Sequence, residues 1–395
     1  MLEGPSLNPK KEDFPLNPEA DTEAFKFHQD RFKKIAEVRS KKLINRVIRK
    51  KINPIDVAHK EALRDNADFK KRKNEEFQEW ERMGKPALEH FKAKKNDPEG
   101  EGKKYKTLIL VLGGGKKVAQ SAGQLTAMHY MGYKNAVEEI FGVSGGGPVA
   151  AYYVAGEDNG RKGTSIFTEE ANDREFFTPH RFSQMIKIRH LGRAWRSGPK
   201  ALDTDAISNS RTKLRVAVSK KDQGKVSWVD VKTAKPDMVS ALEATGNIPF
   251  FKGEGIEVNG EMCYDGSFAQ IDLEEIIKMS GATDIIILPN KPFEEMDKIG
   301  ASFLPPSVMN KIPNTGSIGI FKKFLEVSKE LKKVLKDAKE TEGVNIAVLW
   351  PPDSGIGNTT MNVDDLKASI YESARATFKA FGEEVQDVQL YRTPK

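Results

Sequence analysis

The sequence predicts an α/β protein with a mostly parallel central sheet, preceded by a charged, mainly helical extension. Continuous apolar runs, which are typical of strands buried on both faces, alternate along the chain with segments of helical periodicity. Glycine-dense turns join strand to helix at two places, and most of the basic excess lies in the first quarter of the chain. Together these observations indicate an α/β domain with an appendage on its N-terminal side.

The α/β domain is assigned to residues 105–395. Its expected strands occupy 107–112, 138–143, 284–289 and 344–349, with antiparallel strand pairs at 213–230 and 255–264. Its expected helices occupy 122–131, 148–156, 236–245, 272–280, 317–338 and 363–383. Residues 157–210 are polar and are expected to be irregular. Whether they cover the site as a lid stays open.

The predicted extension covers residues 1–104 and ends in the polar segment 94–104. It carries 26 lysines and arginines against 20 acidic residues, whereas the rest of the chain carries 38 against 37. The basic residues are densest at 31–51, where apolar residues recur at helical spacing. Such a helix either lies on an anionic membrane surface or packs its apolar stripe on the neighbouring domain. Both interpretations stay open.

The composition excludes several classes of protein. The single cysteine, Cys263, excludes an internal disulfide framework and a cysteine-based metal cluster. The chain has no run of eighteen apolar residues, so no transmembrane helix is predicted, and its N-terminus lacks the pattern of a secretion signal. We therefore expect a cytoplasmic protein, peripherally membrane-associated if segment 31–51 contacts lipid, with no specific nucleic acid partner.

The segment Gly142-Val143-Ser144-Gly145-Gly146 matches G-x-S-x-G, the nucleophile elbow. A serine on a very tight turn between strand and helix adopts strained dihedral angles. The residues two before and two after it must be small, because strand and helix approach closely there. The bare motif also fits an ordinary glycine-rich turn. The expected strand before it and the uncharged helix after it favour the elbow.

A second glycine-rich turn, Gly113-Gly114-Gly115, follows the apolar run 107–112. Three glycines between a strand and a helix expose backbone N–H groups, and a developing anion lodges well against them. Nucleotide-binding loops are disfavoured here. The G-x-x-x-x-G-K-[ST] motif is absent, and G-x-G-x-x-G fails at Val118.

A nucleophilic serine needs a base. In the α/β-hydrolase order a histidine would follow the acid near the end of the chain, but no histidine lies beyond His190. His180 and His190 fall in the polar segment and are better explained as surface or packing residues. A buried carboxylate can serve instead, since burial raises its pKa. Asp265, which ends an expected strand and precedes Gly266, is the best candidate, although an Asp-Gly turn would fit as well.

Taken in order, the motifs Gly113-Gly114-Gly115-x-Lys117, Gly142-x-Ser144-x-Gly146 and Asp265-Gly266 resemble the patatin-like phospholipases, which use a Ser–Asp dyad. The segment Ala241–Phe251 is similar to that family's small-residue helix ending in a proline. The resemblance runs from about residue 107 to 380, closest to bacterial members, and does not cover residues 1–100. Two positions depart from the family pattern: Val118 replaces a glycine, and Ser267 follows Asp-Gly.

The resemblance implies a three-layer α/β/α hydrolase without metal or cofactor, acting on phospholipids or other lipid esters. It implies that Ser144 is the nucleophile, Asp265 the base and Gly113–Gly115 the oxyanion loop, with Lys117 at the family's basic position. Gly145 and Gly146 would complete the elbow. The alternative is a weak or inactive lipid-binding protein that keeps this fold, because Val118 and Ser267 could narrow the oxyanion loop.

Overall fold

The computed structural model describes residues 55–173, 175–176, 187–220, 225–248, 254–295, 330–357 and 360–386. The chain divides into two units, Met1–Asn66 and Ala67–Lys395. The sheet and the packing described below belong to the second unit. This unit takes in residues 67–104, which the sequence analysis assigned to the extension. The basic segment 31–51 lies outside the described residues.

The predicted α/β class with a mostly parallel sheet is confirmed. Among the described residues the sheet has eight strands in the order β5-β6-β3-β2-β1-β7-β8, with β4 also paired to β3. The run β3-β2-β1-β7-β8 is parallel, whereas β4, β5 and β6 pair antiparallel. The strands are β1 (Thr107–Val111), β2 (Glu139–Val143), β3 (Lys213–Lys220), β4 (Ser227–Asp230), β5 (Ile256–Val258), β6 (Glu261–Asp265), β7 (Asp284–Leu288) and β8 (Asn345–Val348).

The central strands are apolar throughout because both of their faces are covered. In β1 every residue is buried, and alternate side chains enter two separate hydrophobic clusters. Ile109 and Val111 belong to one cluster, and Leu108 and Leu110 to the other. Since successive side chains of a strand point to opposite faces, the sheet lies between two apolar layers. This is the predicted three-layer arrangement.

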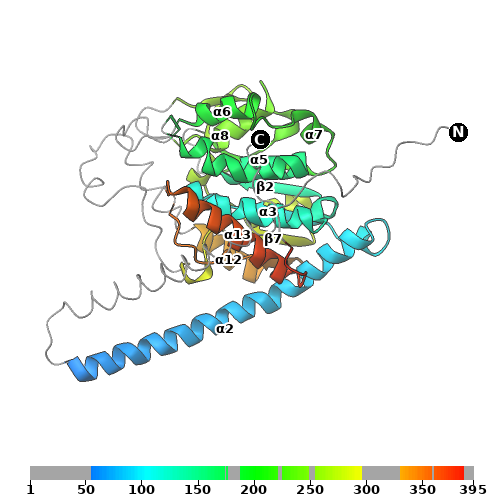
Figure 1. Cartoon of the computed structure of the whole chain (residues 1–395). Helices are drawn as coiled ribbons and strands as arrows, with labels where there is room; N and C mark the ends of the chain where they lie inside the picture. Colours follow the sequence, from blue (N-terminus) through cyan, green and yellow to red (C-terminus); the bar gives the residue numbers. More distant parts are fainter. Residues whose placement is uncertain are drawn as a thin grey trace. The chain divides into compact units, whose positions relative to one another are not determined.

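The helices of the described residues supply those layers. Figure 1 shows α3, α5 and α13 side by side on one face of the sheet, and residues of α4 and α8 enter the same cluster. Residues of α9 and α12 enter the cluster on the other face. The helices are α2 (Ile55–Asn96), α3 (Ala119–Tyr130), α4 (Gly146–Ala155), α5 (Glu157–Thr168), α6 (Ile188–Arg196), α7 (Thr204–Asn209), α8 (Met238–Thr245), α9 (Leu273–Ser280), α12 (Glu330–Glu340) and α13 (Val363–Ala380).

The expectation that 157–210 is irregular is wrong for the described part of that segment, which contains α5, α6 and α7. In α5 the apolar residues are few, but Gly163 lets the helix approach α4 so closely that a Cβ there would lie 2.8 Å from the Cβ of Tyr152. In α6 the buried residues Ile188, Leu191 and Trp195 follow helical spacing. Close packing through a small residue therefore holds α5, whereas an apolar face holds α6.

The second half of α2 packs into the α/β unit. Its residues Trp80, Ala87 and Phe91 are buried, and the Lys94 ammonium bonds the Glu138 carboxylate at 2.5 Å. In the part of the chain that the structure describes, no helix combines the length and apolarity needed to cross a membrane. The antiparallel strands β5 and β6 turn as predicted at Asn259 and Gly260, both of which have positive φ.

Candidate active site

Ser144 occupies the turn between β2 and α4 and has φ of 53°, a value that residues with side chains rarely adopt. At the neighbouring glycines no larger residue fits, because a side chain would collide with nearby backbone atoms. A Cβ on Gly142 would lie 2.5 Å from the Cα of Gly147, and one on Gly146 would lie 2.5 Å from the carbonyl oxygen of Val111. Strand and helix therefore meet with no room for side chains, and the serine is the residue that projects. This is the geometry of the elbow.

Thr245, at the end of α8, holds the turn in place. Its hydroxyl oxygen accepts a hydrogen bond from the Ser144 backbone N–H at 3.0 Å. Its side chain is fully buried, and its methyl group would lie 2.8 Å from a Cβ on Gly147. The threonine thus satisfies a buried donor of the strained turn and packs against the start of α4.

Asp265 is the hydrogen-bond partner of Ser144. The Ser144 hydroxyl donates to Oδ2 of Asp265 at 2.6 Å. The other carboxylate oxygen, Oδ1, accepts the backbone N–H of Ser267 at 2.8 Å, and the Asp265 carbonyl accepts the Ser219 hydroxyl at 2.9 Å. Gly266 crosses directly over Ala217, leaving no space for a side chain. The structure therefore brings together the two groups that sequence reasoning identified separately.

The electrostatics of this pair suit proton transfer. Asp265 is completely buried and Ser144 is 8% exposed. Burial raises the pKa of Asp265 to about 6, against hydrogen bonds from Ser144 and Ser267 that lower it. A carboxylate whose pKa lies this close to neutrality is ionised at pH 7 yet is a stronger proton acceptor than an exposed aspartate.

The glycine loop lies beside the serine. A Cβ on Gly113 would be 2.8 Å from the Cβ of Ser144 and 3.5 Å from its Oγ. Gly115 has a positive φ of 55°, and together with Gly145 it lines the same cavity as Ser144. The two glycine-rich turns predicted from the sequence therefore meet at one place. Oxyanion holes are commonly formed by backbone N–H groups close to the reacting oxygen.

Asn290 supports the glycine loop from behind. This residue is fully buried and has φ of 55°. Its amide nitrogen donates to the Leu112 carbonyl, and its amide oxygen accepts the Ser121 hydroxyl at 2.5 Å. A Cβ on Gly114 would lie 3.2 Å from the Cβ of Asn290. The loop is thus held between the end of β7 and the start of α3.

The two consecutive lysines after the loop point to different partners. Lys117, the residue expected near the oxyanion, forms an ion pair with Glu295 at 2.6 Å. Lys116 instead lines the cavity of Ser144. Val118 is buried, and its Cγ1 would lie 2.9 Å from a Cβ on Gly145. The valine therefore packs on the elbow turn, in the space that a glycine would leave open.

A largely apolar cavity leads away from Ser144. Its walls come from α4, α5 and α6 and from the segment around Ala171. Besides Ser144, Gly115, Lys116 and Gly145, its lining residues are Pro148, Val149, Tyr152, Ile166, Phe167, Ala171, Phe176, Ile188, Leu191, Trp195, Gly246 and Ile248. The part of an aliphatic chain that entered such a space would be removed from water.

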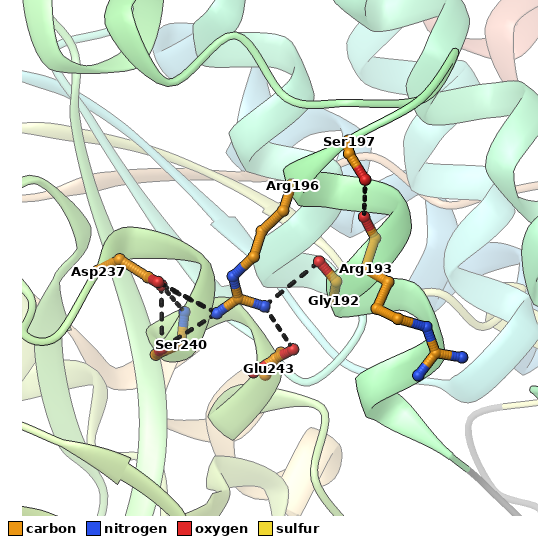
Figure 2. Close-up of polar contacts among 7 residues, drawn as sticks. All are labelled: Gly192, Arg193, Arg196, Ser197, Asp237, Ser240 and Glu243. Carbon is orange, nitrogen blue, oxygen red and sulfur yellow. Dashed lines mark hydrogen bonds and ion pairs between the residues drawn. The ribbon is translucent and has the colours of Figure 1, made fainter.

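One wall of the cavity is fastened by Arg196, at the end of α6 (Figure 2). Its guanidinium donates to the Glu243 carboxylate at 2.8 Å and to Asp237 at 3.1 and 3.2 Å. A further bond at 3.2 Å reaches the Ser240 hydroxyl. All three acceptors lie on α8 or at its N-cap, and α8 ends in the threonine that holds the Ser144 turn. The wall and the elbow therefore share one support.

Two histidines of the described residues, His190 and His90, have carboxylate partners other than Asp265. His190 Nδ1 lies 3.3 Å from Glu175, and its Nε2 lies 3.4 Å from Glu170. His90 contacts Asp284 at 2.6 Å. His180 lies outside the described residues. The pairing of Ser144 with Asp265 is consistent with a serine–aspartate arrangement.

Sequence reasoning missed Thr245, Asn290 and Lys116. Thr245 stands before a glycine at a helix end, and Asn290 follows a buried strand, so each had only a weak positional signal. The family resemblance assigns the basic position to Lys117 and gives no role to the adjacent Lys116. None of the three roles follows from a local motif, since each depends on contact with a distant segment.

Comparisons with known proteins add only distant similarities. No family model and no curated protein matches the chain. The chain is similar to the crystal structure of VipD from Legionella pneumophila, with 13% identity and a TM-score of 0.33 over 70% of this chain and 67% of that chain. It is also similar to the structure of full-length SpcU in complex with full-length ExoU from the type III secretion system of Pseudomonas aeruginosa. There the identity is 15% and the TM-score 0.26, over 59% of this chain and 52% of that chain.

Replacing Asp265 with asparagine is expected to stabilise the fold at neutral pH. The folded pKa of about 6 exceeds the ordinary value of 3.8. The contribution of Asp265 to the free energy of unfolding is therefore fully present below pH 3.8 and is lost as the pH rises through about 6. The loss amounts to about 3 kcal/mol at pH 7. In urea unfolding, the free energy of unfolding of Asp265→Asn should exceed that of the wild-type protein. This difference should grow by about 1 kcal/mol between about pH 5 and 7 and then stay constant.

Asp237→Asn is the matched control for this measurement. Partial burial raises the pKa of Asp237, but hydrogen bonds from Ser240 and the charge of Arg196 outweigh it, so the pKa is lowered overall. Its contribution is therefore present at neutral pH and lost as the pH falls. Asp237→Asn should destabilise the protein at pH 7. Equal effects of the two substitutions would contradict the assigned burial of Asp265.

Arg196→Gln is expected to lower the free energy of unfolding by about 1–3 kcal/mol, because it leaves the buried Glu243 carboxylate without its counter-charge. Adding Glu243→Gln should recover much of the loss, since the unpaired charge is then removed. Urea unfolding of the two single variants and the double variant measures this coupling. Strictly additive losses would show that the pair contributes nothing to holding α6 on α8.

Proposed function

We propose that this protein is a lipid acyl hydrolase of the phospholipase A or carboxylic ester hydrolase type. The observation that carries the proposal is the 2.6 Å hydrogen bond from the Ser144 hydroxyl to the buried Asp265 carboxylate, with Ser144 lining an apolar cavity. A serine on a strained turn, a partner of raised pKa and a cavity suited to an aliphatic chain are the parts that ester hydrolysis of a lipid requires.

The proposed reaction has two steps. Ser144 Oγ attacks the ester carbonyl while its proton passes to Asp265, giving a tetrahedral intermediate. The intermediate collapses, Asp265 returns the proton to the leaving alcohol, and the acyl group stays bound to Ser144. Water then attacks the acyl-enzyme while Asp265 takes its proton, and a second tetrahedral intermediate forms. As the bond to Ser144 Oγ breaks, Asp265 returns the proton to that oxygen, and the fatty acid is released.

Backbone groups would stabilise the oxyanion of both intermediates. The glycine loop Gly113–Gly115 contacts Ser144 from one side, and Gly145 starts the turn into α4 on the other. The N-terminus of α4 adds a partial positive charge near the same oxygen. Gly142, Gly146 and Gly266 act indirectly, since each permits a backbone approach that keeps the reacting groups in contact. No metal or cofactor is invoked for any step.

The substrate class follows from the cavity. Because its lining is almost entirely apolar, the acyl chain would occupy the space between α4, α5 and α6 with its ester at Ser144. The basic segment 31–51 lies outside the described residues, and its attraction to anionic membranes stays a prediction from the sequence. A 1–104 extension bringing the 105–395 domain to a lipid surface would fit a lipid substrate.

Ser144 is expected to react with an active-serine probe. A fluorophosphonate should label the folded protein at Ser144, and Ser144→Ala should abolish both labelling and hydrolysis across a panel of lipid esters. Mass spectrometry of the labelled peptide identifies the site. Ser219→Ala, which removes another buried hydroxyl near Asp265, serves as control and should keep the label. Lipid binding without labelling or turnover would instead identify a non-catalytic lipid-binding protein.

The pH dependence should report Asp265. Because the base must be ionised to accept the serine proton, kcat/KM is expected to rise about tenfold per pH unit below pH 6 and to level off above it. Asp265→Asn should lose about 10²–10⁴-fold in turnover. A rate profile with no inflection between pH 5 and 7, in wild-type protein with measurable turnover, would argue against Asp265 as the base.

A further inference from the structure

Lys116 is the one charged residue among those that line the cavity within the described part of the chain. It follows the glycine loop directly, and only 4% of its surface is exposed. It lines the same cavity as Ser144 and Gly115, and the other lining residues carry no charge. A lysine that only served packing would normally extend its ammonium group to water.

The partners of Lys116 are neutral. Its ammonium donates to the Asn172 side-chain oxygen at 2.5 Å and to the Met361 sulfur at 2.9 Å. The Asn172 amide nitrogen donates to the Met361 carbonyl at 2.9 Å, which fixes the amide with its oxygen toward the lysine. These contacts orient the ammonium group, but they supply no counter-charge.

The other buried lysines of the described residues differ in this respect. Lys94 contacts the Glu138 carboxylate at 2.5 Å, and Lys200 contacts Glu169 at 2.8 Å. Buried charges in proteins are usually paired in this way, because taking a cation out of water is costly. Burial lowers the pKa of Lys116 to about 8, so it is still largely charged at pH 7. The missing counter-charge is therefore expected to come from a ligand.

We propose that Lys116 binds an anionic group of the substrate, the phosphodiester of a glycerophospholipid, while the ester lies at Ser144 and the acyl chain fills the cavity. This inference rests on the proposed function and adds a specificity residue to it. In such a lipid only a few bonds separate the phosphodiester from the ester. Lys116 and Ser144 line the same cavity, as this requires. Charge-assisted hydrogen bonds to phosphate oxygens are shorter and stronger than neutral ones.

The test compares two esters with identical acyl chains, a phosphatidylglycerol and the matching diacylglycerol, presented in the same neutral detergent micelles. Lys116→Met should lower the ratio of kcat/KM for the phospholipid to that for the diacylglycerol by roughly ten- to a hundredfold. The change should fall mainly on KM. Lys278→Met removes an equal charge from an exposed position on α9 and should leave the ratio unaltered. An unchanged ratio in Lys116→Met would overturn the assignment.

A second arm distinguishes the source of the anion. If the free fatty acid product supplies it through its carboxylate, Lys116→Met should weaken inhibition by that fatty acid while the ester ratio stays constant. That result would also overturn the phosphodiester assignment. Fluorophosphonate labelling of Ser144 in Lys116→Met shows whether the variant is folded and competent.

A third arm needs no turnover. In the Ser144→Ala background, a fluorescent phospholipid should bind at least tenfold more weakly when Lys116 is methionine, and a neutral diacylglycerol analogue should not. This arm separates the two proposals. If no ester is hydrolysed and Ser144 is not labelled, the hydrolase proposal fails, yet selective binding through Lys116 would still be measurable. If labelling and hydrolysis are intact but binding does not discriminate, only the Lys116 inference fails.

Discussion

The contact between β2 and α4 is the constraint on which the rest of this structure depends. The strand must reverse into the helix within the space left by Gly142 and Gly147, and this forces Ser144 into a positive φ. Strain of this kind costs on the order of 1–3 kcal/mol and persists only where the surroundings over-determine it. Here the surroundings are Thr245 and Asp265. Thr245 accepts a hydrogen bond from the Ser144 backbone N–H, and Asp265 accepts one from the Ser144 hydroxyl. The site is thus an arrangement that the fold must hold against its local preference.

The order of strands explains how two residues so distant in sequence become partners. Val143 pairs with Ala217 of β3, so Ser144 lies in line with the next residue, Val218. On the other side of β3, the antiparallel strand β6 places Asp265 opposite the same Val218. Two strand spacings of about 4.8 Å separate the backbones of serine and aspartate. Side chains pointing to the same face can close that gap. A one-residue shift in either pairing would send one of them to the other face.

The fold class, the central strands and the elbow could be predicted because each leaves a local pattern. A continuous apolar run such as 107–112 is typical of a strand covered on both faces, and small residues such as Gly142 and Gly146 are needed where a helix leaves a strand this tightly. In α5 there is no such pattern, since Gly163 packs by being small rather than by being apolar, whereas in α6 the helical spacing of Ile188, Leu191 and Trp195 lies within a mostly polar segment. Thr245, Asn290 and Lys116 were missed for a related reason. Their roles are set by register and by the path of segments far away in the sequence.

Asp265, which bonds Ser144, and Lys116, which lines the cavity, are buried charges of opposite sign, and neither has a counter-charge. Asp265 is buried without a cation among its hydrogen-bond partners, and its raised pKa makes it a better base at the expense of stability. Lys116 is buried beside neutral atoms, and the pKa of its ammonium is lowered by the same desolvation. The two charges are not paired with each other. A fold that needed stability alone would have matched or removed both. One anion that bonds Ser144 and one cation that lines the cavity therefore stay buried without a counter-charge. These two groups are the proposed proton acceptor for the serine and the proposed site for an anionic group of the ligand.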